Sequence, residues 1–333
     1  MLIKDMVEIY SPTGSEEKLV DFLIQWATNN GFKAYKDEVG NFVAEKGSGR
    51  EVLLVGHVDT ITGEINVKVE NGKLYGRGAV DAKGALACFL EAANTVNKGK
   101  IIVIGAVDEE GESRGARNIL NKFNPEFIIV GEPSGWSNLN MGYKGTMNLY
   151  YVNEREKEHG SSSNLNCYEE AIDFYNRLKN YCNSFDQGKG LFNQLGIKIS
   201  AINSGDDGFK EHIEMVVNFR IPIGFDLGGL KNLVYENRGK AGIKYSSVEK
   251  PVKADKGNKL VSSFIKAIRS AGGEVKFKLK SGTSDMNVLQ DYKVPMVTYG
   301  PGGFNLEHTP NEHLDLDEYR KAIGILKMVL EEI

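Results

Sequence analysis

Short apolar runs alternate with helix-like patterns along much of the chain. The apolar runs occupy residues 41–47, 51–56, 101–107, 127–131 and 295–300. Apolar residues three and four positions apart predict helices between several of them, at 83–98, at 114–122 and from a Ser15 cap to Gly31. Strands that alternate with helices favour a sheet of parallel strands covered by helices. We therefore predict an α/β fold with a mostly parallel sheet.

The middle of the chain has a different order of elements. Residues 143–252 read as strand, helix, two strands, helix and strand, the order of a split βαβ or ferredoxin-like α+β domain. A helical pattern and the run near 295 then resume the first pattern. We predict one domain formed by residues 1–142 and 253–333, with residues 143–252 inserted into it. No internal repeat or low-complexity tract is present.

Composition excludes several classes of protein. The 333 residues are 41% hydrophobic with a formal net charge of -4, so we expect a globular protein that does not bind nucleic acid. The three cysteines are an odd number without a CxxC pair, which argues against a disulfide framework. Charges recur at short intervals near the N-terminus, so we expect no signal peptide and no membrane span, and a cytoplasmic protein.

Side chains that bind metals follow the apolar runs. In open α/β sheets, ligands lie beyond the carboxyl ends of the strands. Each residue alone has an ordinary explanation as a structural histidine, solvated acid, helix cap or turn residue. Five segments that deliver such groups to one sheet edge favour a shared site instead. The residues are His57, Asp59, Asp81, Glu109, Glu110, Glu132 and His308.

The residue types restrict the metal. Two imidazoles and several carboxylates, with no nearby cysteine, suit zinc or a similar divalent ion such as cobalt or manganese. One carboxylate can bridge two ions about 4 Å apart, as in two-metal hydrolases.

Five motifs carry a resemblance to a known family. "GHVDT", "YGRGAVDAKGALACFLEAA", "DEEG", "GEPS" and "LEHTPNE" resemble the motifs of dinuclear zinc hydrolases. This family includes aminoacylases, acetylornithine deacetylase, succinyl-diaminopimelate desuccinylase and glutamate carboxypeptidase. The resemblance covers essentially the whole chain. It implies a metallopeptidase-like catalytic domain, two Zn²⁺ per chain with Co²⁺ as a substitute, and amide hydrolysis.

The resemblance also implies a role for each residue at the sheet edge. His57 and Glu110 would hold one zinc, Glu132 and His308 the other, and Asp81 would bridge the two. Asp59 would accept the second ring N–H of His57 and fix its orientation. Glu109 would be the general base that passes a proton from water to the leaving amine.

In the same family the inserted domain is a lid or dimerisation domain. We therefore expect a homodimer, in which His159 reaches across to the partner's site and stabilises the oxyanion. The resemblance places Arg220, Ser281, Gly282 and Thr283 around the substrate's free carboxylate, although Arg220 alone reads as a surface strand residue. The chain lacks the family's Asn-Val-x-Pro turn, so a catalytic contact from residues 206–212 stays open.

A narrower resemblance concerns the substrate. "KSGTSDMNVLQ" and "TYGPGGFNLEHTPNEHLDLDEY" resemble the hydrolases that free lysine or ornithine from an amino-group carrier protein, the LysK type. There the amino acid's α-amino group is joined to the side-chain carboxylate of the carrier's C-terminal glutamate. The resemblance implies lysine biosynthesis through aminoadipate, and arginine biosynthesis.

The basic residues between 253 and 280 give weaker support to a carrier protein as the partner. Residues 253–280 contain eight Lys or Arg and two acidic residues, which would attract an acidic carrier protein or form a solvated helix face. Two other functions stay open: a deacylase or dipeptidase for small molecules, and a binding protein without catalysis.

Overall fold

The computed structural model describes residues 1–161 and 163–333 and contains two compact units. The large unit comprises Met1–Gly142, Lys253–Leu279 and Ser284–Ile333. The small unit comprises Tyr143–Val252 together with Lys280–Thr283, a short piece that the sequence analysis had placed in the other domain.

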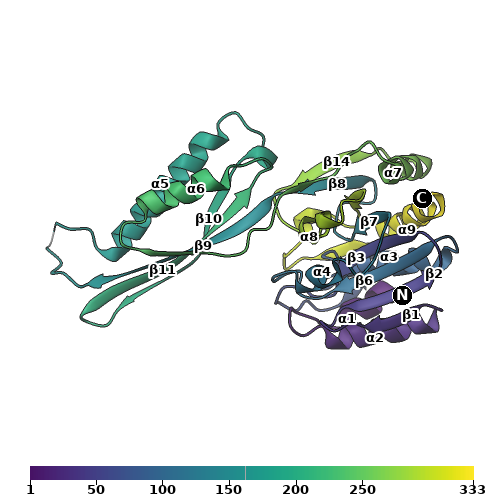
Figure 1. Cartoon of the computed structure of the whole chain (residues 1–333). Coiled ribbons are helices and arrows are strands. Elements are labelled where there is room, and N and C mark those ends of the chain that lie inside the picture. The colour runs from purple at the N-terminus through teal and green to yellow at the C-terminus, as the bar shows by residue number, and fades with distance from the viewer. Residues whose placement is uncertain (162) are drawn as a thin grey trace. The chain divides into compact units, whose positions relative to one another are not determined.

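A nine-stranded sheet forms the centre of the large unit (Figure 1). Its order is β1-β2-β6-β3-β7-β15-β8-β13, with β14 also paired to β8. Strands β6, β3, β7 and β15 are parallel, whereas β1, β2 and β8 pair antiparallel. The predicted α/β fold with a largely parallel central sheet is confirmed. The strands are β1 (Lys33–Lys36), β2 (Phe42–Gly47), β3 (Glu51–His57), β6 (Lys100–Ala106), β7 (Phe127–Val130), β8 (Asn138–Tyr143), β13 (Val252–Lys253), β14 (Lys276–Lys280) and β15 (Met296–Thr298).

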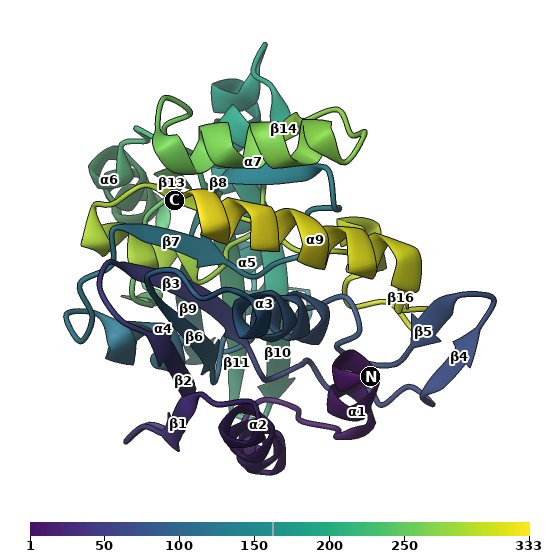
Figure 2. The same ribbon diagram turned by 90° about the vertical axis from the view of Figure 1, so that its right-hand side faces the viewer.

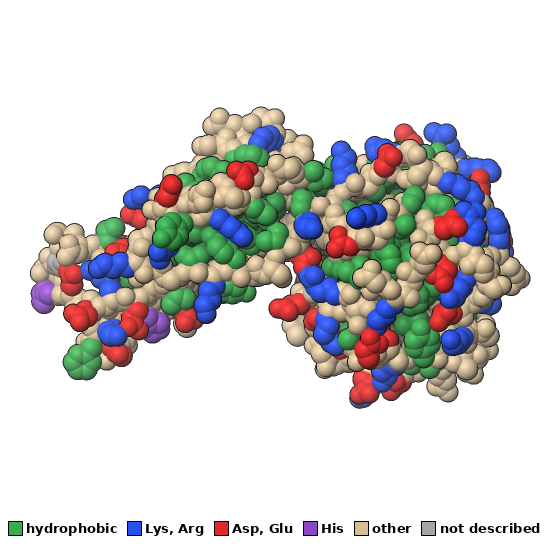
Figure 3. Space-filling view, viewed as in Figure 1, with side chains coloured by type: hydrophobic (Ala, Val, Ile, Leu, Met, Phe, Trp, Pro, Cys, Tyr) green, Lys and Arg blue, Asp and Glu red, His purple; other side chains and the backbone are tan. Residues whose placement is uncertain are grey.

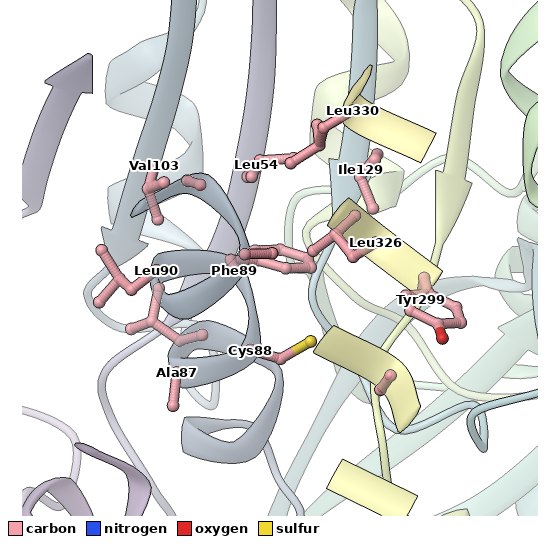
Figure 4. Packing of buried hydrophobic residues seen from close by; sticks show 14 of the residues in the cluster. Leu54, Ala87, Cys88, Phe89, Leu90, Val103, Ile129, Tyr299, Leu326 and Leu330 are labelled. Atoms are coloured by element: carbon pink, nitrogen blue, oxygen red, sulfur yellow. The ribbon is translucent and has the colours of Figure 1, made fainter. Parts of the chain in front are cut away.

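Helices cover both faces of this sheet, which is why its central strands are apolar throughout. Helices α3 (Lys83–Thr95), α7 (Lys259–Ser270) and α9 (Leu316–Glu332) lie together on one face (Figure 2). There Leu54, Val103 and Ile129 pack with Phe89 and Leu326 (Figure 4). Burying one such side chain contributes about 1.5–3 kcal/mol. The short helices α4 (Arg114–Ile119) and α8 (Met286–Leu289) contact β6 and β15 respectively.

The N-terminal helices show where local prediction was inexact. Helix α1 spans Leu2–Glu8 and α2 spans Glu17–Asn29. The N-cap of α2 is Glu16 rather than the predicted Ser15, and no side chain caps it. Gly31 follows the helix with φ +81, a left-handed conformation that suits glycine. A small antiparallel sheet, absent from the sequence-based prediction, consists of β4 (Lys68–Glu70), β5 (Lys73–Tyr75) and β16 (His313–Asp315).

The small unit has the predicted α+β order of elements. Its sheet runs β10-β11-β9-β12 with antiparallel pairs, and two helices cover one face (Figure 1). Odd-numbered residues of β11 from 211 to 221 are buried, because side chains alternate between the helix-covered face and the open face. The elements are β9 (Gly145–Glu156), α5 (Cys167–Asp186), β10 (Gly196–Asp206), β11 (Lys210–Ile221), α6 (Leu227–Asn237) and β12 (Gly242–Tyr245).

The cysteines and the helices bear on two further expectations. Cys88, Cys167 and Cys182 are free and buried. Among the described residues, no helix combines the length and the apolar composition needed to cross a bilayer.

Candidate metal centre

The parallel strands of the large unit bring three of the predicted segments to one edge. His57 is the last residue of β3, while Glu109 and Glu110 follow β6 and Glu132 follows β7. Because these neighbouring strands run parallel, their carboxyl ends meet. Asp81 lies just before α3.

The Asp81 carboxylate contacts both predicted histidine ligands. Its Oδ1 lies 3.3 Å from Nε2 of His57, and its Oδ2 lies 3.1 Å from Nε2 of His308. Asp81 is buried, with 8% of its surface exposed. Its two oxygens therefore face two imidazoles from different segments, the arrangement that a bridging ligand requires.

The other two carboxylates pair differently from the arrangement that the resemblance implied. Glu110 Oε1 lies 2.9 Å from Nε2 of His308, and Glu132 Oε1 lies 3.9 Å from Nε2 of His57. These shortest contacts pair His308 with Glu110 and His57 with Glu132. The resemblance implies the opposite assignment.

Donor atoms are close enough together to hold divalent cations. One group consists of His57, Glu109 and Glu132, and a second consists of His57, Asp81 and Glu110. Within each group, one donor atom per residue lies within 4.8 Å of the others. Nitrogen and carboxylate oxygen without thiolate is a donor set that suits zinc and similar ions.

The acidity of the carboxyls also favours a cation here. Burial and the charge of Glu132 raise the pKa of Glu109 well above its ordinary value. Burial and the charge of Asp59 raise the pKa of Asp285 to about 7. Carboxyls this crowded resist ionisation together, and a divalent cation would relieve that repulsion. The residues therefore fit a metal site.

The neighbouring carboxylates also change the pKa values of the two imidazoles. Hydrogen bonds with Asp81 and Glu110 raise the pKa of His308 to about 10. Burial alone would lower the pKa of His57, but contacts with Asp59 and Asp81 outweigh it and the pKa is raised. In the metal-free protein both rings tend to carry a proton, which a metal ion would have to displace.

Asp59 has a broader set of contacts than the predicted bond to His57. Nδ1 of His57 lies 2.9 Å from the Asp59 backbone carbonyl and 3.4 Å from its carboxylate. The carboxylate accepts hydrogen bonds from Thr13 Oγ1 at 2.9 Å and from the backbone N–H groups of Glu109 and Glu110 at 3.1 Å. Burial opposes ionisation, but these bonds and His57 outweigh it and lower the pKa of Asp59. Asp59 thus ties two segments of the centre together.

Two glycines let the chain turn sharply before Asp81. Gly76 has φ +153, and a Cβ there would lie 2.2 Å from Cγ1 of Val7. Gly78 has φ +85, and a Cβ there would lie 2.8 Å from Cγ2 of Thr60. The "YGRG" motif therefore supplies both the conformation and the close approach that this loop needs.

Sequence reasoning missed several buried polar residues beside the centre. They are Arg77, Lys83, Asp285 and Glu312. Lys83 Nζ donates to the carbonyls of Ile9 at 2.7 Å and Met6 at 3.3 Å, which fixes the end of α1 against the start of α3. Each lies inside a quoted motif, but a charged residue next to a stronger ligand candidate reads as solvated, and only burial shows otherwise.

The residues predicted to bind a substrate carboxylate lie together in the small unit. Arg220 Nη1 is 3.3 Å from Oγ1 of Thr283, and Arg220, Ser281 and Gly282 line a cavity of about 900 Å³. His159 is exposed beyond β9, with Nδ1 2.9 Å from Oγ of Ser161. At the tip of the β10–β11 hairpin, the Asp207 carboxylate accepts hydrogen bonds from the backbone N–H groups of Phe209 and Lys210. These bonds close a tight turn.

Comparison with known proteins identifies the family. The model of "Peptidase family M20/M25/M40" matches residues 53–332. A LysW-lysine hydrolase of Deinococcus radiodurans is 34% identical over 347 residues, with 100% of this chain and 96% of the relative covered. A LysW-lysine/LysW-ornithine hydrolase of Saccharolobus islandicus is 32% identical over 342 residues, covering 100% and 95%.

Solved structures share the fold at lower identity. A tripeptidase from Staphylococcus aureus has a TM-score of 0.80 and 19% identity, and covers 99% of this chain and 96% of its own. The resemblance drawn from the five motifs is therefore confirmed. The chain belongs to peptidase family M20/M25/M40.

Proposed function

We propose that the chain releases lysine or ornithine from an amino-group carrier protein by metal-dependent amide hydrolysis. The bond cut would join the amino acid's α-amino group to the side-chain carboxylate of the carrier's C-terminal glutamate. The observation that carries the proposal is the convergence of two imidazoles and four carboxylates at one sheet edge, in a chain whose full-length relatives have LysW-hydrolase names. The reaction would end lysine biosynthesis, and serve arginine biosynthesis where ornithine is released.

The metal ligands we propose follow the distances. His57 with Glu132 would hold one ion and His308 with Glu110 the other, and Asp81 would contact both. Zinc fits this donor set, and cobalt would substitute for it. When bound, two such ions would supply Lewis acidity toward the amide carbonyl and would allow water to react at neutral pH.

Glu109 is the residue we propose as general base. It lies beside the proposed ligand Glu110, and one of its oxygens is within 4.8 Å of donor atoms of His57 and Glu132. A base of this kind takes a proton from the attacking water and delivers it to the leaving α-amine. Asp59 would keep Glu109 in place, because it accepts the Glu109 backbone N–H.

The small unit would supply recognition of the amino acid. We propose that Arg220, Ser281, Gly282 and Thr283 hold the free carboxylate, since an arginine fork can bind both carboxylate oxygens. The cavity that three of them line also contains the side chains of Asn148, Lys198 and Asn218, so its charged groups are cations. Such a lining suits an anionic group.

A dimer would complete the site. Strand β10 is an edge strand of the small sheet and exposes Ile199 at 39% and Ile202 at 55%. An exposed apolar edge favours pairing with a second copy. We propose that this dimer brings His159 of one copy to the oxyanion in the other.

The carrier itself would meet a basic surface of the large unit. Lys and Arg side chains gather over α7 and β14 (Figure 3). Lys278 Nζ donates to the Ser134 carbonyl at 3.1 Å, so one of these cations contacts the loop that contains Glu132. Opposite charge would speed the encounter with an acidic carrier.

One substrate panel tests the proposal. The purified enzyme, supplied with Zn²⁺ or Co²⁺, would be assayed on the carrier–lysine and carrier–ornithine conjugates, acetylornithine and succinyl-diaminopimelate. We expect release from the conjugates with kcat/KM at least tenfold above that for either small compound. A clear preference for a small compound would replace the proposed substrate with an acylated amino acid.

A further inference from the structure

A buried carboxylate holds the backbone that carries Asp81. Glu312 is 1% exposed, and its Oε1 accepts the backbone N–H groups of Val80 at 2.9 Å and Asp81 at 3.1 Å. Both N–H groups lie in the loop before Ala82, the N-cap of α3, where the carboxylate supplies the partner that buried backbone donors need. The two contacts fix the backbone on both sides of the peptide bond that leads into Asp81.

Arg77 holds the other oxygen of the same carboxylate. Its Nη1 lies 2.8 Å from Oε2 of Glu312 and 3.3 Å from the carbonyl of Thr309, and its Nε donates to the carbonyl of Gly63 at 2.9 Å. Arg77 is also buried, with 8% of its surface exposed. One guanidinium therefore spans three segments of the large unit.

The pair joins the two segments that present Asp81 and His308 to each other. Arg77 lies four residues before Asp81, and Thr309 directly follows His308. Removing two opposite charges from water is costly, and an apolar pair of similar volume is often as stable. Stability alone is thus a weak explanation for a charged pair here, whereas control of the loop geometry needs the directional bonds that it makes.

We propose that Arg77 and Glu312 are positioning residues, which set the distance between the Asp81 carboxylate and the His308 imidazole and so determine metal affinity. This inference rests on the proposed role of Asp81 and His308 as ligands. Neither Arg77 nor Glu312 would touch the metal or the substrate. Their effect would pass through the backbone of residues 80 and 81 and the carbonyl of Thr309.

The test measures metal affinity directly. Glu312→Gln keeps an oxygen for the two N–H groups but loses the charge that faces Arg77, and Arg77→Met removes the guanidinium. Zn²⁺ affinity would be measured by competition with a chromophoric chelator, after circular dichroism has shown that each variant is folded. We expect at least tenfold weaker binding of the tighter ion in both variants. Binding within twofold of the unchanged protein would overturn the proposal.

A matched pair on the surface is the control. Arg50 and Glu126 form an exposed pair in the same unit, with the Arg50 Nε 2.6 Å from a Glu126 oxygen. Glu126→Gln removes the same chemical group without touching residues 80, 81 or 309. We expect its Zn²⁺ affinity to stay within twofold of the unchanged protein.

A double variant separates positioning from stability. Arg77→Met combined with Glu312→Leu replaces the charged pair with apolar side chains, and we expect its metal-free thermal midpoint to recover relative to Arg77→Met alone. Its Zn²⁺ affinity should stay weak, and kcat at saturating metal should fall more than KM changes. Recovery of affinity together with stability would show a purely structural role.

The outcomes also distinguish this inference from the proposed substrate. Metal affinity is measured without any conjugate, so weaker binding in the variants supports the positioning role even if no carrier conjugate is cleaved. Failure of the unchanged protein to bind Zn²⁺ would overturn the positioning role and the proposed metal site together.

Discussion

Acidic side chains gather in both units, but their surroundings differ. In the small unit Arg155 lies among the acids, 2.8 Å from Glu158, 3.2 Å from Glu170 and 3.9 Å from Glu211. At the sheet edge of the large unit, His57 and His308 contact Asp81 and Glu110, and oxygens of Glu109 and Glu132 lie within 4.8 Å of each other. Arg155 is permanently charged and contacts all three acids of the first group, whereas Asp81 and Glu110 contact imidazoles, which carry a charge only when protonated.

That difference separates a charged surface from a site for a cation. Near Arg155, Glu158 and Glu170 line a cavity of about 780 Å³ together with Arg177, Arg238 and Lys240. At the sheet edge, burial and neighbouring charge raise the pKa values of Glu109 and Asp285. The number of acidic residues is thus less informative than whether a permanent cation lies within contact of them.

Replacing Glu109 at the sheet edge should lower kcat/KM far more than replacing an acid near Arg155. For Glu109→Ala we expect kcat/KM to fall about 10²–10⁴-fold, because a general base is lost, while metal content stays nearly unchanged. Glu170→Ala, in the Arg155 group, is the control and should leave kcat/KM within about twofold. Steady-state kinetics and metal analysis check both. Loss of metal with Glu109→Ala would instead make Glu109 a ligand, as its closeness to His57 and Glu132 allows.

The arginines of the small unit can be compared in the same way. Arg220→Met should raise KM about 10–100-fold, since hydrogen bonds between charged groups contribute about 1.5–3 kcal/mol. Arg155→Met should leave KM unchanged, because its partners are the chain's own acids. Initial rates over a range of conjugate concentration measure both. An equal rise in KM for the two variants would remove Arg220 from the proposed carboxylate site.

The pH dependence of metal binding tests the charge balance at the sheet edge. Imidazoles must lose protons to bind a metal, and His308 has its pKa raised to about 10. We therefore expect Zn²⁺ affinity to increase about tenfold or more from pH 6 to pH 8, with protons released on binding. Calorimetry in two buffers of different ionisation enthalpy counts these protons. Affinity that is independent of pH would contradict a site built on His308.

A smaller effect is expected for Asp285 in the metal-free protein. Its pKa in the folded protein is about 7, above the ordinary 3.8, so between these values the folded state binds more protons than the unfolded state. The stability that protonated Asp285 contributes is therefore lost as the pH rises from 3.8 to about 7. Asp285→Asn should raise the thermal midpoint by a few degrees at pH 8 and by less at pH 5, where only part of this contribution has been lost.

The exposed Asp173 of the small unit is the control for that experiment. Asp173→Asn should shift the thermal midpoint by the same small amount at both pH values. A pH-independent effect of Asp285→Asn would mean that its carboxyl is ionised across the whole range.

The fold could be predicted from the sequence where a pattern repeats. Apolar runs such as 51–56 and 127–131 became central strands, because strands buried on both faces need continuous apolar residues. The small sheet of β4, β5 and β16 was missed, since its three-residue strands are too short for a period to show. The Ser15 cap was wrong by one residue, because local preferences do not decide which turn of the chain begins the helix.

The candidate site could be predicted for residues that end strands. His57, Glu110 and Glu132 follow apolar runs, and parallel pairing places them at one edge. The pairing of each histidine with its carboxylate depends on loop conformations that no spacing reveals, and the contacts favour the opposite assignment. Arg77 and Glu312 are 235 residues apart, so only the folded chain shows that they meet.

One titration tests the central claim most directly. Enzyme freed of metal with a chelator would receive increasing Zn²⁺, while bound metal and lysine released from the carrier conjugate are measured in the same samples. We expect no release of lysine without metal, and a rise in release to a plateau at about two ions per chain. Lysine release by the metal-free enzyme, or two bound ions without any release, would contradict it.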